Sequence, residues 1–428
     1  MIHYNRLGYE IKRDLTKFSL NISKELKRPQ RKFVHQMLYG ILAGNKVHLS
    51  EIARALKENI TLKKTIDRLS RNLNAFEDRQ LVLKDYLSLI KQHVKEDYAV
   101  LIIDNSDIAK PSSKKLEALS EIRDGSTGEI TTGYQTIEAA VLSEAGKMPL
   151  PVYEKVFSAS EAGFISETYE NLCCLEALSE HFSPKCVRTL DRGFDANDYY
   201  RYFLKHGERF VIRAKKNRNV IYNGKTRNIM DVAALYKGNY RMDFTDKSGK
   251  TINRKISCIP VRLCEFPAKE LVLIAVYGFG VEPMLLLSNL RMQEKKELCH
   301  IVAKVYLLRW RIEEYFKFKK QQFELEDLRV MSLQSIRNLN LLATLAAGYI
   351  GLTSAIHKDS LYLKELKECS KRIYGVPKFI FYALGYALEQ ILTMSHTGIS
   401  AYMPQKVKSQ QITLFDYFKI ADPGGFAF

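Results

Sequence analysis

The sequence lacks the short motifs by which many enzymes bind nucleotides or catalytic zinc. It contains no H-E-x-x-H, P-loop, G-x-G-x-x-G or G-x-S-x-G pattern, so it gives no case for a zinc protease, an ATP- or NAD-dependent enzyme or an α/β-hydrolase. Its seven cysteines are odd in number, and no two are spaced as C-x-x-C. A disulfide framework or zinc ribbon is therefore not expected, and the cysteine usage fits a reducing cytoplasm.

Long apolar runs are also missing. The longest one in the C-terminal part, within residues 338–356, contains Asn, Thr and Gly, and we expect a buried helix there rather than a membrane span. The N-terminus has no apolar core of the signal-peptide kind. An amphipathic membrane anchor with a Trp/Phe/Leu face is not apparent either, so we expect no membrane partner.

Acidic residues are in deficit. The chain has 66 Lys and Arg against 48 Asp and Glu, which gives a net charge of +18. Such an excess favours a polyanionic partner such as DNA through phosphate neutralisation and counterion release. A protein that is merely basic, or one that lies on an anionic membrane surface, would have the same balance.

The N-terminal part carries much of this excess. Residues 1–75 hold 16 Lys and Arg against 6 Asp and Glu and contain little Gly or Pro, which predicts helices. VHLSEIARAL followed by ITLKKTIDRLSRNL resembles a helix-turn-helix, with Ser50 as a candidate N-cap. Its second helix would present Lys63, Lys64 and Arg68 to DNA, unless the segment is only a solvated basic bundle.

The middle of the chain has an α/β pattern. Apolar runs rich in β-branched residues at 98–107, 135–142, 148–158 and 186–191 predict strands, and helices are expected at 166–181 and 195–206. Residues 218–290 alternate polar and apolar residues and predict an all-β insertion. We expect residues 294–329 to form one long helix and the rest, to about 395, to be helical.

These patterns predict an α/β fold with a mixed sheet, an all-β insertion and helical N- and C-terminal regions. The predicted domains are a helical DNA-binding domain (1–95), the first part of a catalytic core (96–217), the β-rich insertion (218–290), the core helix (291–330), a helical C-terminal region (331–398) and a tail (399–428).

Two adjacent glutamates occur in YLLRWRIEEYFKFKK, residues 306–320. On a helical wheel with Tyr306 at zero, Arg309, Glu313 and Lys320 all fall within an arc of about 60°, whereas Glu314 falls near +80°. The spacing therefore favours Glu313 as the chemical group of an acidic and basic stripe. The alternative is a solvated face with this pattern by coincidence.

Two aspartates end apolar runs, Asp104 in LIIDNSD and Asp191 in VRTLD. Catalytic groups gather where strands of a sheet end. Together with Glu313 these carboxylates could bind two Mg²⁺ ions, because Mg²⁺ prefers hard oxygen ligands. Three other aspartates compete for these roles: Asp107, Asp195 and Asp198.

These residues carry a resemblance to insertion-sequence transposases of the DDE class, whose catalytic domain is RNase-H-like. Tyr306, Arg309, Glu313 and Lys320 match the signature Tyr-x-x-Arg-x-x-x-Glu-(six residues)-Lys of the cut-and-paste branch, with every spacing kept. VRTLDRGFDANDYY and LIIDNSDIAKP resemble the segments around the two aspartates. The family also places a β-rich insertion before the glutamate. The resemblance covers residues 95–330 well and the N-terminal domain loosely.

The resemblance implies that Asp104, Asp191 and Glu313 bind two Mg²⁺ ions, for which Mn²⁺ can substitute. It implies that Tyr306, Arg309 and Lys320 contact the DNA backbone near the cleaved end. Family members bind terminal inverted repeats, cleave the transposon ends, form and reopen a hairpin, and join the 3′-hydroxyl to target DNA, acting as a homodimer in the DNA complex. The location would be the cytoplasm, at the nucleoid.

Two further residues near the site each have two interpretations. Arg192, beside Asp191, could reach a phosphate or pair with a local carboxylate. Trp310, the only tryptophan, could stack on a base, but core packing is the preferred interpretation.

The tail contains QQITLFDYF, which resembles peptides that bind the replication sliding clamp. It could also be an amphipathic segment that packs on the protein. The candidate clamp-binding residues are Gln411, Leu414, Phe415, Tyr417 and Phe418.

The sequence therefore predicts a DNA transposase. The alternatives are an RNase-H-like nuclease that cuts without joining and a DNA-binding protein that has lost catalysis.

Overall fold

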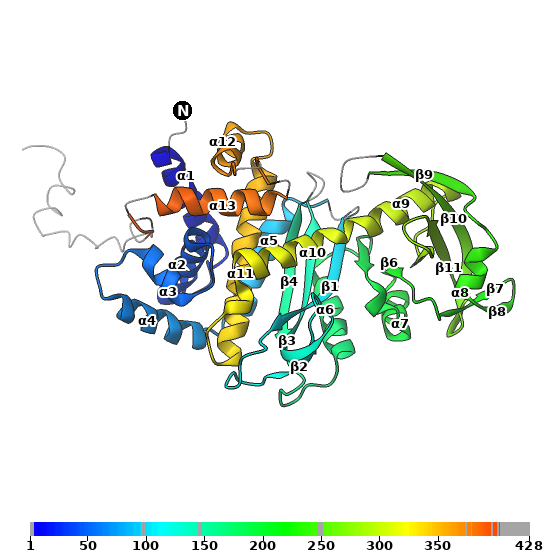
Figure 1. Ribbon diagram of the computed structural model, residues 1–428, viewed down its shortest axis with the longest axis horizontal. Helices are drawn as coiled ribbons and strands as arrows, with labels where there is room; N and C mark the ends of the chain where they lie inside the picture. Colours follow the sequence, from blue (N-terminus) through cyan, green and yellow to red (C-terminus); the bar gives the residue numbers. More distant parts are fainter. Residues whose placement is uncertain are drawn as a thin grey trace, which may run out of the picture.

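The structure is a computed structural model that describes residues 4–402, apart from 96, 98, 144–147, 246–250, 373, 374, 378, 395, 396, 400 and 401. Its centre is a mixed sheet (Figure 1). The central strands are β1 (Val100–Ala109), β2 (Ser120–Arg123), β3 (Ile130–Leu142), β4 (Pro149–Phe157), β5 (Val187–Leu190) and β6 (Arg209–Arg213).

The directions of these strands are those of an RNase-H-like core. β3 lies antiparallel between β1 and β4, and β5 lies parallel between β1 and β6. Parallel strands of such a sheet are buried on both faces, and residues 100–103 of β1 and 187–190 of β5 are all buried. This arrangement confirms the α/β fold class predicted from the sequence.

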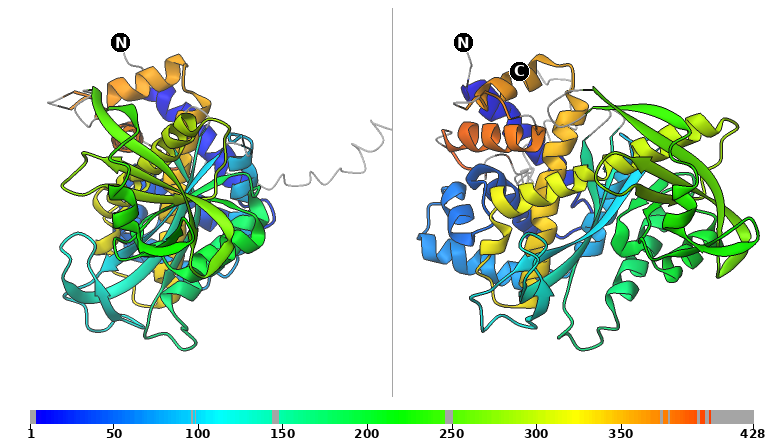
Figure 2. Two further views of the ribbon diagram at one scale, coloured as in Figure 1. Left: turned by 90° about the vertical axis from the view of Figure 1, so that its right-hand side faces the viewer. Right: turned by 45° about the vertical axis from the view of Figure 1, so that its right-hand side comes forward.

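The insertion continues the same sheet, because β12 pairs antiparallel with β6. Its long strands β10 and β11 form an antiparallel hairpin at one end of the molecule (Figures 1 and 2). The prediction of an all-β insertion was wrong in one detail, because a short helix, α8 (Ile229–Ala234), lies within it. Its strands are β7 (Asn219–Tyr222), β8 (Lys225–Asn228), β9 (Tyr240–Thr245), β10 (Thr251–Leu263), β11 (Phe266–Tyr277) and β12 (Met284–Ser288).

Helices cover both faces of the central sheet. Helices α6 (Glu167–His181) and α7 (Asn197–His206) lie on one face, where Asn105 on β1 donates a hydrogen bond to Glu167 at 2.6 Å. The neighbouring Asp104 points to the other face, because side chains alternate along a strand. Asp104 therefore lies on the face covered by the helix that carries Glu313.

That helix is not continuous, and the prediction of a single helix over 294–329 was wrong. It consists of α9 (Lys295–Leu308) and α10 (Trp310–Lys317), followed by a π-helical turn, Phe318–Gln322, which we call the π segment. A one-turn 3₁₀-helix, Leu325–Asp327, comes next. A π-helical turn is wider than an α-helical turn and often lies at a functional site.

The N-terminal region is helical, as predicted. Its helices are α1 (Tyr4–Asn21), α2 (Arg28–Gly44), α3 (Leu49–Leu56), α4 (Leu62–Asn74) and α5 (Arg79–Lys91). Helices α3 and α4 match the predicted helix-turn-helix segments. Ser50 is not the N-cap, however, because α3 begins at Leu49 and its cap residue is His48.

The C-terminal helices are α11 (Leu333–Ile356), α12 (Leu361–Cys369) and α13 (Ile380–Thr393). Helix α11 is long and apolar enough to cross a membrane, but 83% of its most apolar window is buried inside the protein. It packs on β4 and on α2, between the sheet and the N-terminal helices (Figure 1). The expectation of a buried helix over residues 338–356 is therefore confirmed.

Candidate active site

The register of the sheet brings Asp104 and Asp191 together. Ile103 on β1 pairs with Leu190 on the parallel strand β5, so the next residues along the two strands are the two aspartates. Asp191 ends β5 and caps the following 3₁₀ turn, where its carboxylate accepts a hydrogen bond from the backbone N–H of Gly193 at 2.6 Å. Asp104 lies within β1 rather than at its end, which corrects the sequence prediction.

Glu313 reaches the same place from α10. Arg309, at the junction of α9 and α10, forms an ion pair with Asp104 and another with Glu313 at 2.6 Å. The four-residue spacing puts Arg309 and Glu313 on one face of the helix. Glu314 instead pairs with Arg311 at 2.9 Å. The structure therefore places Glu313, and not Glu314, beside the two aspartates.

The charges in this cluster act on one another. Burial raises the pKa of Asp104 to about 7; Arg309 opposes this shift, whereas the negative charges of Asp191 and Glu313 add to it. Burial lowers the pKa of Arg309, but Asp104, Tyr306 and Glu313 together outweigh that effect and the net shift is upward. The charges of Asp191 and Glu313 thus disfavour the ionised form of Asp104 unless a cation lies nearby.

The donor set suits a divalent cation, since carboxylate oxygens are the ligands that Mg²⁺ prefers. Across the described residues, no three His, Cys, Asp or Glu side chains are already arranged to hold a metal ion. The guanidinium of Arg309 lies between Asp104 and Glu313 and neutralises them. Metal binding by all three carboxylates therefore requires Arg309 to move.

The competing aspartates have other partners. Asp107 is buried and accepts a hydrogen bond from Gly125 N at 3.2 Å. Asp195 is buried among Tyr200, Arg218 and the backbone N–H of residue 215. Asp198 is exposed and pairs with Arg201 at 2.6 Å. Each of the three competing aspartates thus has partners outside the group formed by Asp104, Asp191, Arg309 and Glu313.

The remaining signature residues, Tyr306 and Lys320, are less accessible than contact with the DNA backbone would require. Tyr306 is only 1% exposed, so in this conformation its side chain is not available to a phosphate. Its hydroxyl has no hydrogen-bond partner among the described residues. Lys320 lies in the π segment, where it pairs with Asp107 at 3.0 Å and Glu326 at 3.1 Å. The predicted stripe of acidic and basic residues is therefore interrupted before Lys320, because the π turn displaces this residue from its position on the α-helical wheel.

Two side chains beside the cluster reach solvent. Trp310 is 46% exposed, so the preferred interpretation as a core residue was wrong. Arg192 is exposed next to Asp191, and within the described part of the chain it makes no ion pair. Of the two interpretations of Arg192, pairing with a local carboxylate is therefore not seen among the described residues.

The predicted DNA-binding cations of α4 fall into two groups. Lys63 and Lys64 are exposed. Arg68 is half-buried and donates hydrogen bonds to Glu58 at 2.6 Å and to Gln36 at 2.7 Å. Arg68 therefore holds α4 against α2 and is not free to bind a phosphate. The candidate clamp-binding residues lie outside the described residues.

The sequence analysis missed a buried ion pair next to the site. Lys319, the neighbour of Lys320, pairs with Glu138 on β3 at 2.8 Å. Glu138 is the cross-strand partner of Asp104. A carboxylate within the apolar strand sequence TIEAAVL was the available signal, because such a residue needs a buried partner.

Part of the chain matches a known protein family. Residues 168–348 match the family described as "Transposase DDE domain"; this range contains Asp191 and Glu313 and begins after Asp104. The curated proteins include no match. Among solved structures, the chain is similar to the piggyBac transposase in its synaptic complex with hairpin DNA, with 11% identity and a TM-score of 0.43, over 100% of this chain and 87% of that chain. Residues 168–348 are thus similar to a transposase domain of the DDE class.

Proposed function

We propose that the protein cleaves the ends of a mobile DNA element and joins the freed 3′-hydroxyl to target DNA. The observation that carries this proposal is the convergence of Asp104, Asp191 and Glu313, which come from two parallel strands and a helix far apart in the sequence. A transposase domain supplies the reaction class.

In this proposal the three carboxylates hold two Mg²⁺ ions, or Mn²⁺ in their place. Two such ions activate a water or a 3′-hydroxyl and stabilise the leaving oxygen of a phosphodiester. Arg309 neutralises the carboxylates before the metal binds and then turns to a phosphate oxygen. The exposed Arg192 binds DNA beside the site, and Lys320 exchanges Asp107 for a phosphate.

Exposed cations of the N-terminal helices bind the terminal repeats. Lys63 and Lys64 on α4 contact phosphates, and such contacts make affinity depend on salt. Two copies of the chain act together, one on each end of the element. The Tyr-Arg-Glu-Lys signature supports a hairpin intermediate, which forms when the freed 3′-hydroxyl attacks the opposite strand.

The test is cleavage of a DNA duplex carrying the ends that flank this gene, in Mg²⁺, by wild type, Glu313→Gln and Glu314→Gln. Glu314→Gln is the matched control, because it changes the adjacent residue by the same atoms. We expect Glu313→Gln to bind DNA but to nick it about 10²–10³-fold more slowly, since a metal site supplies several kcal/mol of charge stabilisation. Glu314→Gln should cleave like wild type.

The products separate the remaining possibilities. A hairpin migrates on a denaturing gel as a strand of double length, and joined products contain target sequence. Cleavage without joining would indicate a nuclease. If Glu314→Gln is the inactive variant, or if wild type does not cleave, the assignment of the site is wrong and a non-catalytic DNA-binding role takes its place.

A further inference from the structure

A row of carboxylates crosses the central sheet next to the candidate active site. Asp104 on β1 pairs with Glu138 on β3, and Glu138 pairs with Glu154 on β4. Directly opposed residues point to the same face of a sheet. Each carboxylate meets a cation from a different element: Asp104 meets Arg309 from the α9–α10 junction, Glu138 meets Lys319 from the π segment, and Glu154 meets Arg79 from α5.

The pair between Glu138 and Lys319 is more deeply buried than the pair between Asp104 and Arg309 at the site. The exposed fraction of Glu138 is 2% and that of Lys319 is 1%. Burying an ion pair costs desolvation energy, and a well-packed apolar pair of similar size often stabilises a fold equally well. Stability alone therefore does not account for this pair.

Lys319 ties the π segment to the sheet. Its ammonium group donates to both carboxylate oxygens of Glu138, at 2.8 and 3.0 Å, and to Asn340 and Thr344 of α11, at 2.8 and 2.9 Å. The hydroxyl of Tyr315 also donates to Glu138, at 2.9 Å. The stretch between Glu313 and Lys320 is thus fastened to β3 at two points.

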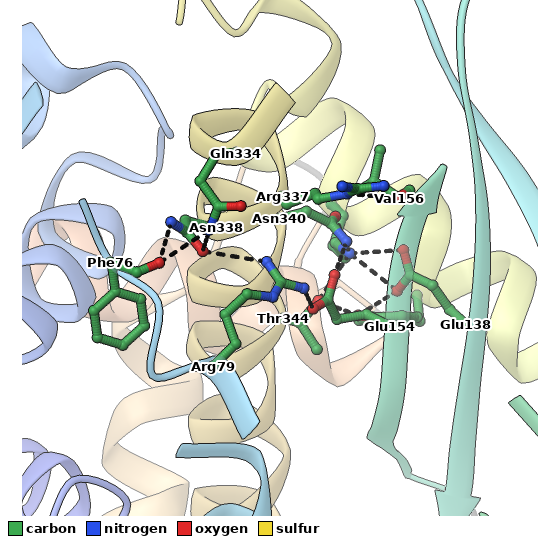
Figure 3. Close-up of polar contacts among 12 residues, drawn as sticks. Phe76, Arg79, Glu138, Glu154, Val156, Gln334, Arg337, Asn338, Asn340 and Thr344 are labelled. Atoms are coloured by element: carbon green, nitrogen blue, oxygen red, sulfur yellow. Dashed lines mark hydrogen bonds and ion pairs between the residues drawn. The ribbon is translucent and has the colours of Figure 1, made fainter. Parts of the chain in front are cut away.

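The same network extends to α4. Figure 3 shows its part between Glu138 and Asn338. Asn340 donates to Glu154, and so does Arg79. Arg79 also donates to Asn338 of α11 at 3.3 Å. The amide of Asn338 donates to the backbone carbonyl of Leu73, in the last turn of α4, at 2.7 Å, and to that of residue 76 at 2.8 Å.

We propose that this network is a rigid link that fixes α4 relative to the segment bearing Glu313, and that it thereby determines which phosphodiester bond is cut relative to the bound DNA. Glu138 and Lys319 are then positioning residues. Apolar packing is non-directional, whereas satisfied buried hydrogen bonds specify one arrangement. This inference rests on the proposed function, because it assumes that α4 binds DNA and that Glu313 acts in cleavage.

The test removes the charges of both partners together, since a single change would leave an unpaired buried charge. The variant is Glu138→Gln with Lys319→Met. The matched control is Arg188→Met with Glu208→Gln, a pair at 2.8 Å with equally buried side chains, 1% and 3% exposed, that contacts no residue of the network.

The measurement is the position of the cut, mapped at nucleotide resolution on an end-labelled transposon end. We expect one bond to be cut by wild type and by the control, and cuts spread over neighbouring bonds in the network variant. Reduced stability alone would lower the yield without moving the cut. A second variant, Asn338→Ala, releases only the α4 end and should also spread the cuts. Cutting at the single wild-type bond by both variants would overturn the proposal.

Amide hydrogen exchange of residues 310–322 provides a readout that does not require activity. We expect it to be roughly tenfold or more faster in the Glu138 and Lys319 variant than in the control, because local opening follows lost tertiary contacts. If wild type cuts no DNA, the proposed function fails, while this exchange still tests the link. Equal exchange in variant and control would refute the link itself.

Discussion

Arg309 gives the sharpest test of the charge balance in the site. It is 5% exposed and pairs with both Asp104 and Glu313. The change Arg309→Met keeps the apolar stem and removes the cation. In the absence of a divalent metal, three carboxylates would then lie together without compensation, and we expect the folded protein to lose stability.

The size of the effect follows from burial. Breaking a buried ion pair by removing one partner costs about 3–5 kcal/mol. The Glu313 side chain is 41% exposed, so its share is that of a surface pair, below about 1 kcal/mol. Most of the loss therefore comes from Asp104, whose side chain is 13% exposed. We expect a total of about 3 kcal/mol in EDTA.

Magnesium should restore much of this stability. A ligand that binds only the folded state stabilises it by RT ln(1 + [L]/Kd), about 1.4 kcal/mol at ten times Kd. Without Arg309 the carboxylates no longer have a competing cation, so Mg²⁺ should bind more tightly, and each tenfold gain in affinity adds about 1.4 kcal/mol at saturating metal. The stabilisation by Mg²⁺ should thus be larger in Arg309→Met than in wild type.

The assay is urea unfolding, measured once in EDTA and once in about 10 mM Mg²⁺. This concentration is roughly ten times a Kd in the millimolar range. Arg188→Met is the control, because Arg188 is equally buried and pairs with Glu208 away from the carboxylate cluster. It should be destabilised in both buffers without rescue. Equal Mg²⁺ stabilisation of wild type and Arg309→Met would refute the view that Arg309 occupies the place of the metal.

Two further predictions concern the N-terminal helices. Burial lowers the pKa of His35 to about 4. Between that pKa and the ordinary value of about 6.5, the unfolded chain binds a proton that the folded protein excludes. The free energy of unfolding should therefore fall by about 3 kcal/mol as the pH drops from about 6.5 to about 4. His35→Phe should flatten this dependence in urea unfolding measured at pH 7 and pH 4.5; an unchanged slope would contradict it. The double change of Lys63 and Lys64 to Ala should reduce the slope of log K against log salt for DNA binding by about 2, with little loss of stability. Arg68→Ala should instead lower stability and leave the salt slope unchanged, since it breaks the contact with Glu58. A salt slope that falls only in Arg68→Ala would contradict the assignment of Lys63 and Lys64 to DNA binding.

The sequence predicted the main elements well because their patterns are local. The apolar runs of β1 and β5 and the helical segments of the N-terminal region lie where periodicity placed them. The break of the helix after Leu308 and the π segment were not predictable in this way. They depend on contacts with distant residues such as Glu138, and these outweigh helical propensity, which is a weak prior.

The same distinction between local and long-range information applies to the predicted site residues. The wheel separated Glu313 from Glu314 correctly in direction, since only two turns of helix are involved. It failed for Lys320, where the π turn changes the angle per residue. It also could not show that Tyr306 is buried while Trp310 is half exposed. A helical wheel gives the direction of a side chain but not the part of the protein that packs against it.

The sequence by itself determined the chemistry of the site: two aspartates after apolar runs, a glutamate four residues from an arginine, and a basic N-terminal region. These are properties of residue type and short spacing. Only the tertiary structure decided that Ile103 pairs with Leu190 and thereby brings the aspartates together. The tertiary structure alone also decided that Arg309 pairs with Asp104 and Glu313 and that a buried network joins α4 to the π segment. Sheet register, ion pairs and buried hydrogen bonds join residues far apart in the sequence, such as Leu73 and Asn338, which are 265 positions apart. No local pattern in the chain records such partners.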